Sequence, residues 1–284
     1  MKICLLGLGR TGSVVAEQLL KTDDLELAAV ITSPGSSKAN RSLREFINCD
    51  TDLVIRDASS LAEECRKTPF TVAIDFTKPE ASLHNARILA EHDVHLVIGT
   101  TGFNKLQLHE LQGLVRRHHI GLVYAPNISV GINLLLILVQ TLAALVPQYD
   151  IEITELHHRY KKDAPSSTAL KIASTVNAAR GIKGREKLCF GRKGATPREA
   201  GEIGIHAIRA GGIAGVHRIL FAGDNDELEI THRSYSRAVF AEGALEAARF
   251  VAPRKGFFNM EGVLAFTDTP DTEAGPDNLQ FNYY

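Results

Sequence analysis

Residues 155–169, with the sequence ELHHRYKKDAPSSTA, carry two adjacent imidazoles and several cations just before a predicted helix. The helix is predicted from the apolar residues that recur at helical spacing from Leu170 to Val176. We expect Asp163 or Ala164 near its N-cap and Pro165 in its first turn. A helix that begins beside imidazoles and ammonium groups is suited to anion binding.

The start of this helix is a candidate anion site. Free backbone N–H groups are expected around Ser166, Ser167 and Thr168, at the positive end of the helix dipole. His158 and Lys161 lie just upstream and add positive charge. The pattern predicts a substrate that bears a carboxylate. The alternative is a basic, solvated connection between a strand and a helix, without a ligand.

We do not expect the histidines to form a metal site. His157 and His158 are neighbours on a predicted strand, so their side chains face opposite ways and do not readily chelate one zinc ion. His206, His217 and His232 lie on later predicted strands, where we expect packing or interface roles.

A glycine-rich loop opens the chain. Residues 2–6 form a buried-strand pattern that runs into GLGRTG and then into a helical pattern, the context that G-x-G-x-x-G needs for a dinucleotide. The glycines allow a tight turn and the approach of a pyrophosphate to the helix N-terminus. The loop residues expected at the cofactor are Gly7, Gly9, Arg10, Thr11 and Gly12.

The turn after the second predicted strand indicates the form of the cofactor. Residues 25–32 end without the acidic residue that would bind a ribose 2′-hydroxyl. Ser33, Lys38 and Arg41 follow, and hydroxyls with nearby cations favour a 2′-phosphate. We therefore expect NADPH to be preferred, with NADH use or a mere polar turn as the alternatives.

Strand, polar turn and helix then repeat with short connections up to residue 128, which predicts an α/β fold with a doubly wound parallel sheet. Ligands of such sheets bind beyond the carboxyl ends of the strands. The residues predicted to line that crevice are Thr77, Gly99, Thr101, Ala125 and Asn127.

The pattern changes at residue 129. A long apolar helix over 129–146 leads to short strands around 151–157, 188–190, 203–209, 215–222 and 227–232, which predict an open mixed sheet with one helix-covered face. A helix over 233–250 then returns. We expect a dinucleotide-binding domain over 1–128, an inserted domain over 129–235, a returning segment over 236–266 and a flexible acidic tail over 267–284.

Composition excludes several classes of function. The 284 residues include 32 basic and 33 acidic ones, so the net charge of −1 gives no footprint for nucleic acid or for an anionic membrane surface. No apolar run has the length of a membrane span. The four cysteines are scattered without a C-x-x-C motif, as in cytoplasmic proteins.

Several of these motifs, in this order, resemble the dihydrodipicolinate reductase family over nearly the whole chain. The resemblance rests on the signature at 157–169, together with Asp75-Phe-Thr77, Gly99-Thr-Thr-Gly102, Ala125-Pro-Asn127, Arg209-Ala-Gly211, Glu229-Ile-Thr-His232, Arg237 and Phe240. It implies a Rossmann-type domain, an inserted α+β substrate domain and a homotetramer formed through the substrate-domain sheets.

The resemblance also implies an activity. Hydride passes from NADPH or NADH to a cyclic unsaturated dicarboxylate, with His157 as proton donor and Lys161 binding substrate and assisting catalysis. The residues implied to hold carboxylates are His158, Ser166, Ser167 and Thr168, and those implied to join the cofactor site are Thr100, Ile128, Arg237 and Phe240.

Three positions depart from the family pattern. The glycine loop is one residue shorter than is common, Ile128 stands where an aromatic residue often follows Asn, and Ser167 replaces a usual glycine. Serine in the first turn of a helix needs no positive φ, so we expect it to be tolerated.

Two other functions compete with this one. An amino-acid or aspartate-type dehydrogenase would share the first domain, but the 157–169 signature argues against it. A catalytically silent NADPH-binding sensor would be expected to lack His157 or Lys161, and both are present.

Overall fold

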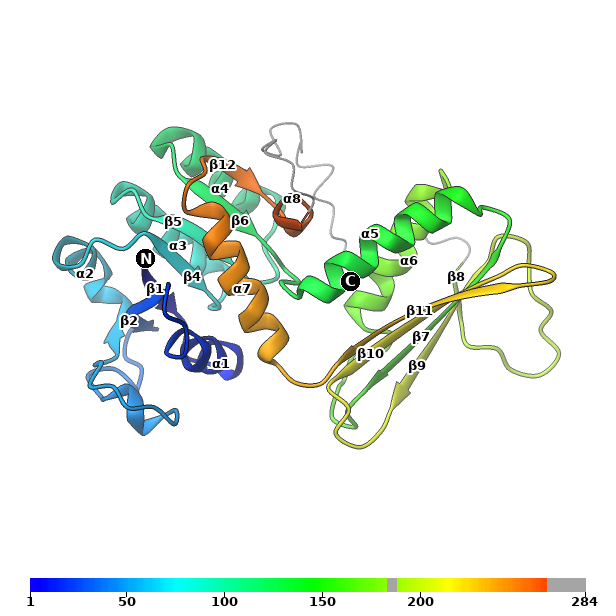
Figure 1. The fold of residues 1–284 in the computed structure, drawn as a ribbon, viewed down its shortest axis with the longest axis horizontal. Helices are drawn as coiled ribbons and strands as arrows, with labels where there is room; N and C mark the ends of the chain where they lie inside the picture. Colours follow the sequence, from blue (N-terminus) through cyan, green and yellow to red (C-terminus); the bar gives the residue numbers. More distant parts are fainter. Residues whose placement is uncertain (183–187, 265–284) are drawn as a thin grey trace. The chain divides into compact units, whose positions relative to one another are not determined.

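The computed structural model describes residues 1–182 and 188–264, and the chain forms two compact units. The first unit contains Met1–Val130 and the segment that begins at Ala238. The second unit, Gly131–Arg237, is inserted between these two parts (Figure 1).

The first unit is built on a parallel sheet. In the described part of the chain its strand order is β12-β6-β5-β4-β1-β2-β3, and every neighbouring pair is parallel. The strands are β1 (Lys2–Leu6), β2 (Glu26–Thr32), β3 (Arg56–Asp57), β4 (Val72–Asp75), β5 (His95–Ile98), β6 (Gly121–Tyr124) and β12 (Gly256–Phe258).

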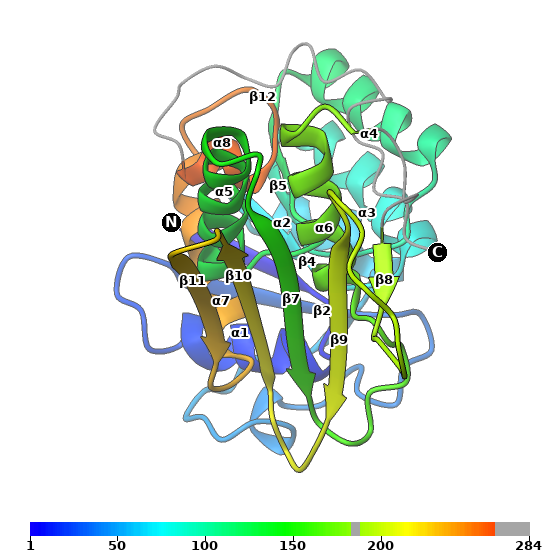
Figure 2. The same cartoon turned by 90° about the vertical axis from the view of Figure 1, so that its right-hand side faces the viewer.

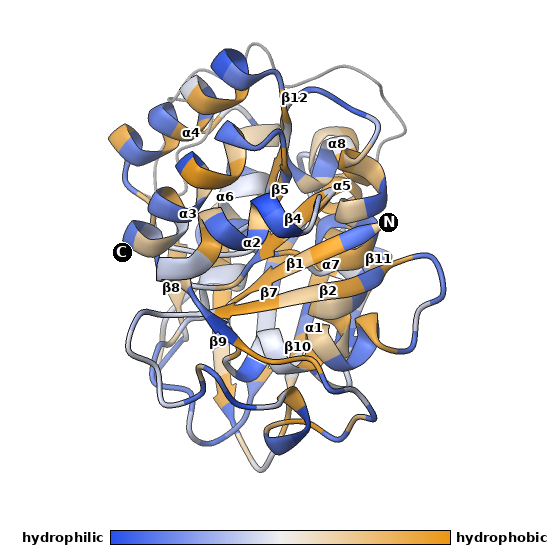
Figure 3. Cartoon of the chain, turned by 90° about the vertical axis from the view of Figure 1, so that its left-hand side faces the viewer, coloured by the Kyte–Doolittle hydropathy of each residue, from blue (hydrophilic) through white to orange (hydrophobic). Residues whose placement is uncertain are grey.

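Helices cover both faces of this sheet because the strand residues are apolar on both sides. Ile3 and Leu5 of β1 pack in one core with α1 (Arg10–Leu19) and α7 (Ala238–Val251). Cys4 and Leu6 pack in a second core, whose helices are α2 (Leu61–Lys67), α3 (Pro79–Glu91) and α4 (Lys105–His118). Figure 3 shows hydrophobic colour along β1 and β2. A short helix, α8 (Met260–Leu264), follows β12.

The second unit is a mixed sheet with helices on one face. Figure 2 shows the sheet in the order β11-β10-β7-β9-β8, in which β7 pairs antiparallel with β10 and parallel with β9. The strands are β7 (Asp150–His157), β8 (Leu188–Phe190), β9 (Ile203–Arg209), β10 (Gly215–Ala222) and β11 (Glu227–Ser234). Their apolar side chains share a core with α5 (Val130–Leu145) and α6 (Ser167–Ala179).

The observed fold confirms the predicted class, a parallel α/β domain with an inserted mixed-sheet domain. No helix in the described residues is long and apolar enough to cross a membrane. The tail predicted to be flexible, residues 267–284, lies outside the described residues.

Some predicted helix boundaries were wrong. Helix α6 is capped by Ser166, whose hydroxyl accepts the Ala169 N–H at 3.1 Å, so Asp163 and Ala164 are not near the cap and Pro165 precedes the helix. The helix expected from residue 233 begins at Ala238, because β11 continues in the ladder to Ser234. The three-residue strand β12 was not predicted, because it is too short to show a periodic pattern.

Candidate functional site

The glycine loop brings two backbone segments into close contact. A Cβ atom on Gly12 would lie 1.8 Å from the carbonyl oxygen of Gly7, and Gly7 itself has a φ of +92°. Gly9 differs, because a Cβ there would meet nothing within 4 Å. Helix α1 has no acidic residue in its first turn. The N-terminus of α1 is therefore open to an anion such as a pyrophosphate.

Two opposite charges lie at the turn after β2. Lys38 Nζ donates to the carbonyl oxygen of Leu8 at 2.6 Å, which places this cation beside the glycine loop. Asp57 Oδ2 accepts the Gly35 N–H at 3.3 Å, and hydrogen bonds from Ser59 lower the pKa of Asp57. Our sequence analysis missed Asp57, because it reaches this turn from β3, which is paired with β2 only in the folded sheet.

The ends of β4 and β5 are joined by a buried carboxylate. Asp75 Oδ1 accepts the Thr77 N–H at 2.8 Å, the Thr77 hydroxyl at 2.7 Å and the Thr100 hydroxyl at 2.9 Å. Burial raises the pKa of Asp75. Thr100 is only 4% exposed. Asp75 therefore holds together the two polar turns that follow β4 and β5. Thr77 and Thr100, which are predicted cofactor residues, lie in these turns.

The other predicted cofactor residues differ in their surroundings. Ala125 and Ile128 are each 2% exposed in the core shared with α1 and α7, so their side chains serve packing. The Asn127 side chain accepts the Ser129 N–H at 3.2 Å. Exposed positions include Gly9, Arg10, Ser33, Thr101 and Arg237, while Phe240 is partly buried against the same core.

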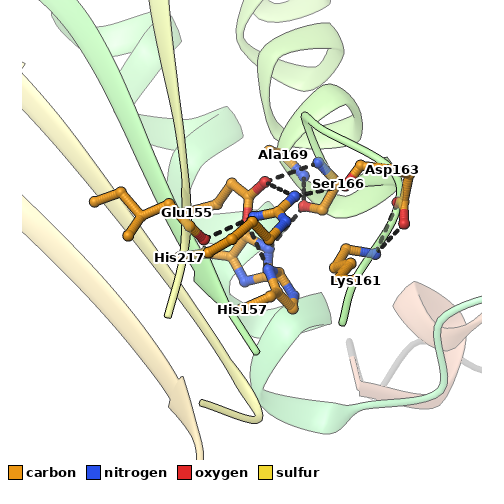
Figure 4. Close-up of polar contacts among 9 residues, drawn as sticks. Glu155, His157, Lys161, Asp163, Ser166, Ala169 and His217 are labelled. Atoms are coloured by element: carbon orange, nitrogen blue, oxygen red, sulfur yellow. Dashed lines mark hydrogen bonds and ion pairs between the residues drawn. The ribbon is translucent and has the colours of Figure 1, made fainter. Parts of the chain in front are cut away.

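In the second unit, sheet register assembles a polar cluster on the helix-covered face. Glu155 and His157 alternate on β7 and so share one face. His217 on β10 lies opposite Glu155, and Arg209 on β9 lies opposite His157. Figure 4 shows the side chains of Glu155, His157 and His217 meeting beside the start of α6.

Glu155 is the centre of this cluster. Its carboxylate is fully buried and lies 2.5 Å from His157 Nδ1, while Arg209 donates to both of its oxygens at 2.9 and 2.7 Å. The Ser166 N–H donates to Oε1 at 3.0 Å. Burial alone raises the pKa of Glu155, but the hydrogen bonds from His157, Arg209 and Ser166 outweigh it and hold the pKa at about 2. Glu155 is therefore an anion at neutral pH.

His217 is a second imidazole in this cluster, and it is buried. It is 4% exposed, its Nε2 lies 3.3 Å from the Ser166 hydroxyl, and its ring centroid is 5.3 Å from that of His157. Burial lowers the pKa of His217 to about 3, so this ring is neutral at neutral pH. His217 therefore has the packing role that was predicted for it, and the ring that it packs against is that of His157, the candidate proton donor.

The loop between β7 and α6 carries the predicted lysine. Lys161 Nζ donates to both carboxylate oxygens of Asp163 at 2.7 Å (Figure 4). Arg209 donates to the Asp163 carbonyl at 2.5 Å. His158 follows His157 directly after β7, and its Nδ1 is buried with no hydrogen-bond partner among the residues that the structure describes. Ser167 and Thr168 form the first turn of α6, where Ser167 takes no positive φ.

The two halves of the chain match the two halves of one protein family. The model of the dihydrodipicolinate reductase N-terminus matches residues 1–128, and that of the dihydrodipicolinate reductase C-terminus matches residues 131–264. The chain belongs to the dihydrodipicolinate reductase family.

Relatives in this family match over nearly their whole length. The chain is 39% identical to a 4-hydroxy-tetrahydrodipicolinate reductase of Methanothermobacter thermautotrophicus over 86% of this chain and 90% of the relative. It is 41% identical to one of Burkholderia mallei over 93% and 98%.

Solved structures that resemble this chain include one from the same family and one that shares only the fold. A dihydrodipicolinate reductase from Paenisporosarcina sp. TG-14, solved with dipicolinate bound, aligns at a TM-score of 0.73 and 27% identity over 91% of this chain and 97% of that one. An amine dehydrogenase from Mycobacterium smegmatis aligns over 90% and 93%, with a TM-score of 0.57 and 11% identity, which is a likeness of fold alone.

Glu155, Arg209 and His217 were not predicted as site residues from the sequence. The i, i+2 spacing of Glu155 and His157 on one strand was the available signal for the first of these. The partners on β9 and β10 give no such signal, since Arg209 is 54 residues from Glu155. No group of three or more His, Cys, Asp or Glu side chains that could hold a metal ion occurs in the described parts of the chain.

The buried neutral His217 predicts how stability depends on pH. Its pKa is about 3 in the folded protein and about 6.5 in an unfolded chain, so between these values the unfolded chain binds the extra proton. The free energy of unfolding should therefore fall as the pH is lowered from about 6.5 toward 5, by at most about 1.4 kcal/mol per pH unit from this residue. Urea unfolding of the wild type and of His217→Asn at several pH values measures the free energy of unfolding. Its slope against pH should be smaller in the variant.

The control is His109→Asn, which changes an exposed histidine on α4. It should keep the wild-type slope. Part of the slope should also remain in His217→Asn, because burial lowers the pKa of His95 and His232 as well. An unchanged slope in His217→Asn would mean that His217 is not neutral in the folded protein.

Proposed function

We propose that this chain is a 4-hydroxy-tetrahydrodipicolinate reductase of the diaminopimelate and lysine pathway, which uses a reduced nicotinamide dinucleotide. Membership of the dihydrodipicolinate reductase family over both halves carries this proposal. In this assignment residues 1–128 and 236–266 hold the cofactor and residues 129–235 hold the substrate.

The proposed substrate is a cyclic dicarboxylate, and the second unit offers donors for its two carboxylates. The first turn of α6 presents backbone N–H groups and hydroxyls at Ser167 and Thr168. Ser166, which the resemblance also implies as a carboxylate-binding residue, already donates its N–H to Glu155 and caps the helix, so we propose that it positions this turn. Lys161 supplies an ammonium group that already binds a carboxylate, that of Asp163. A substrate carboxylate would compete with Asp163 for Lys161, while His158 supplies a further donor.

The residues of the first unit fit a dinucleotide. Gly9 leaves space at the N-terminus of α1 for a pyrophosphate, and Thr77 and Gly99 lie at the carboxyl ends of β4 and β5. When bound, the reduced nicotinamide supplies the hydride.

His157 is proposed to supply the proton. Loss of water from the 4-hydroxy substrate gives a C=C bond conjugated with the imine. Addition of hydride to this bond leaves an enamine-like anion, which needs one proton to complete the two-electron reduction. An imidazolium at His157 provides that proton, becomes a neutral imidazole, and is protonated again from water. Lys161 holds the substrate in place and offsets its negative charge.

Replacement of the proton donor tests the proposal. His157→Gln should lower kcat by roughly 100-fold or more with a smaller change in KM, because an amide cannot deliver the proton but keeps polar contacts. Lys161→Ala should damage both constants. The measurement is NADPH oxidation in a coupled assay, in which a synthase forms the unstable substrate from pyruvate and aspartate semialdehyde. His109→Gln is the control, and a wild type that oxidises no NADPH in this assay contradicts the proposed function.

A modest preference for NADPH over NADH is proposed from the two charges at the β2 turn. Lys38 attracts a 2′-phosphate, whereas Asp57 repels it and can accept a hydrogen bond from a 2′-hydroxyl. Lys38→Ala should lower the NADPH/NADH ratio of kcat/KM by about three- to tenfold, and Asp57→Asn should raise it. The NADPH/NADH ratio of kcat/KM is measured because Lys38→Ala also removes the hydrogen bond from Lys38 to the Leu8 carbonyl, and this loss affects the use of both cofactors equally. A clear NADH preference of the wild type would oppose this assignment.

The family resemblance implies a homotetramer, and we propose that it forms through the face of the mixed sheet that α5 and α6 leave uncovered. This face combines apolar and charged side chains, among them Leu156, Ile208, Arg218 and Glu229. Light scattering should give about four times the monomer mass, and Ile208→Asp should lower it. A monomeric wild type would contradict this assembly.

A further inference from the structure

We propose that Glu155 is the positioning residue of the site: it fixes the protonation geometry of His157 and ties this ring to the carboxylate-binding end of α6. Arg209 balances its charge. This inference rests on the proposed function, since it assumes that His157 is the proton donor.

The carboxylate of Glu155 is saturated by donors. Oε2 faces His157 Nδ1 and Arg209 Nη1, while Oε1 faces Arg209 Nη2 and the Ser166 N–H. An ionised carboxylate only accepts hydrogen bonds, so at 2.5 Å Nδ1 must carry the proton. The opposite tautomer would direct the Nδ1 lone pair at an anion.

The proton that His157 can transfer is therefore the one on Nε2. This nitrogen has no hydrogen-bond partner in the described part of the chain. The strand residue beside it is Gly215, where a Cβ would lie 3.3 Å from Nε2. After transfer, the ring is already the Nδ1–H tautomer that Glu155 stabilises, so no rearrangement is needed.

Arg209 sets the charge of the cluster. A buried carboxylate alone would bind the imidazolium too strongly to favour proton release, but the bidentate guanidinium cancels its charge. The cluster then alternates between +1 and 0 as His157 gains and loses its proton. The titratable and charged groups that face His157 or its partners are Glu155, Lys161, Asp163, Arg209, His217 and His232.

The same carboxylate connects the acid to the anion site. Ser166 donates its N–H to Glu155 and caps α6, whose first turn includes Ser167 and Thr168. Arg209 holds the loop at a second point through the Asp163 carbonyl. The distance between the proton donor and the carboxylate-binding groups is therefore fixed by Glu155.

The test replaces Glu155 by Gln and follows the pH profile of kcat/KM. The alkaline limb, where the donor loses its proton, should move to lower pH by about one unit or more, because the anion that favours the imidazolium is gone. The maximal kcat should fall by roughly 10- to 100-fold. In ¹⁵N spectra of histidine-labelled enzyme, the Nδ1–H tautomer of neutral His157 should lose its dominance.

Glu152→Gln is the matched control. Glu152 lies on the same strand, on the other face, and pairs with two arginines and a histidine, Arg192, Arg198 and His206. Its replacement also breaks a partly buried ionic cluster, but it should leave the alkaline limb and the His157 tautomer unchanged.

Because Glu155→Gln leaves Arg209 without its partner, the variant Glu155→Gln/Arg209→Gln is the second probe in case the first does not fold. It should show the same loss of tautomer preference. A folded variant with the wild-type limb and tautomer would overturn the inference. The spectra need no turnover, so an inactive wild type with an Nδ1–H His157 would reject the proposed function and not this geometry.

Discussion

The second unit depends on one fully buried carboxylate, that of Glu155. A buried charge is costly unless it is paired and hydrogen-bonded, and Glu155 obtains its donors from β7, from β9 and from the residue that caps α6. Removal of any donor leaves part of the charge uncompensated. The strands and the loop are therefore held together by the same group that contacts the imidazole of His157.

The first unit depends on a steric constraint. Gly7 and Gly12 approach each other so closely that a side chain on Gly12 has no room, whereas Gly9 faces open space. The loop thus makes a packing contact at Gly7 and Gly12 and leaves space at Gly9, where we propose that the pyrophosphate binds. At the next turns the constraint is a set of hydrogen bonds. The buried carboxylate of Asp75 accepts hydrogen bonds from Thr77, after β4, and from Thr100, after β5.

The comparison with solved structures shows where the chemistry lies. A protein of only 11% identity shares the fold, so the parallel sheet and the mixed sheet do not by themselves specify a reaction. We propose that the reaction is specified by the residues of the 157–169 signature and their partners on β9 and β10. Register decides these partners, because a shift of one residue would turn His217 away from Glu155.

The sequence alone determined the local features of this protein. Apolar periodicity located most strands and helices, and the glycine motif and the 157–169 signature indicated a dinucleotide loop and a candidate proton donor. These are patterns of neighbouring residues. Tertiary structure decided which distant groups complete the sites: Asp57 beside the β2 turn, and Arg209 and His217 beside Glu155. The tertiary structure also shows that Ser166, and not Asp163 or Ala164, caps α6, and that the Ser166 N–H donates to the Glu155 carboxylate. Strand pairing brings such residues together across tens of positions, and no local pattern encodes that pairing.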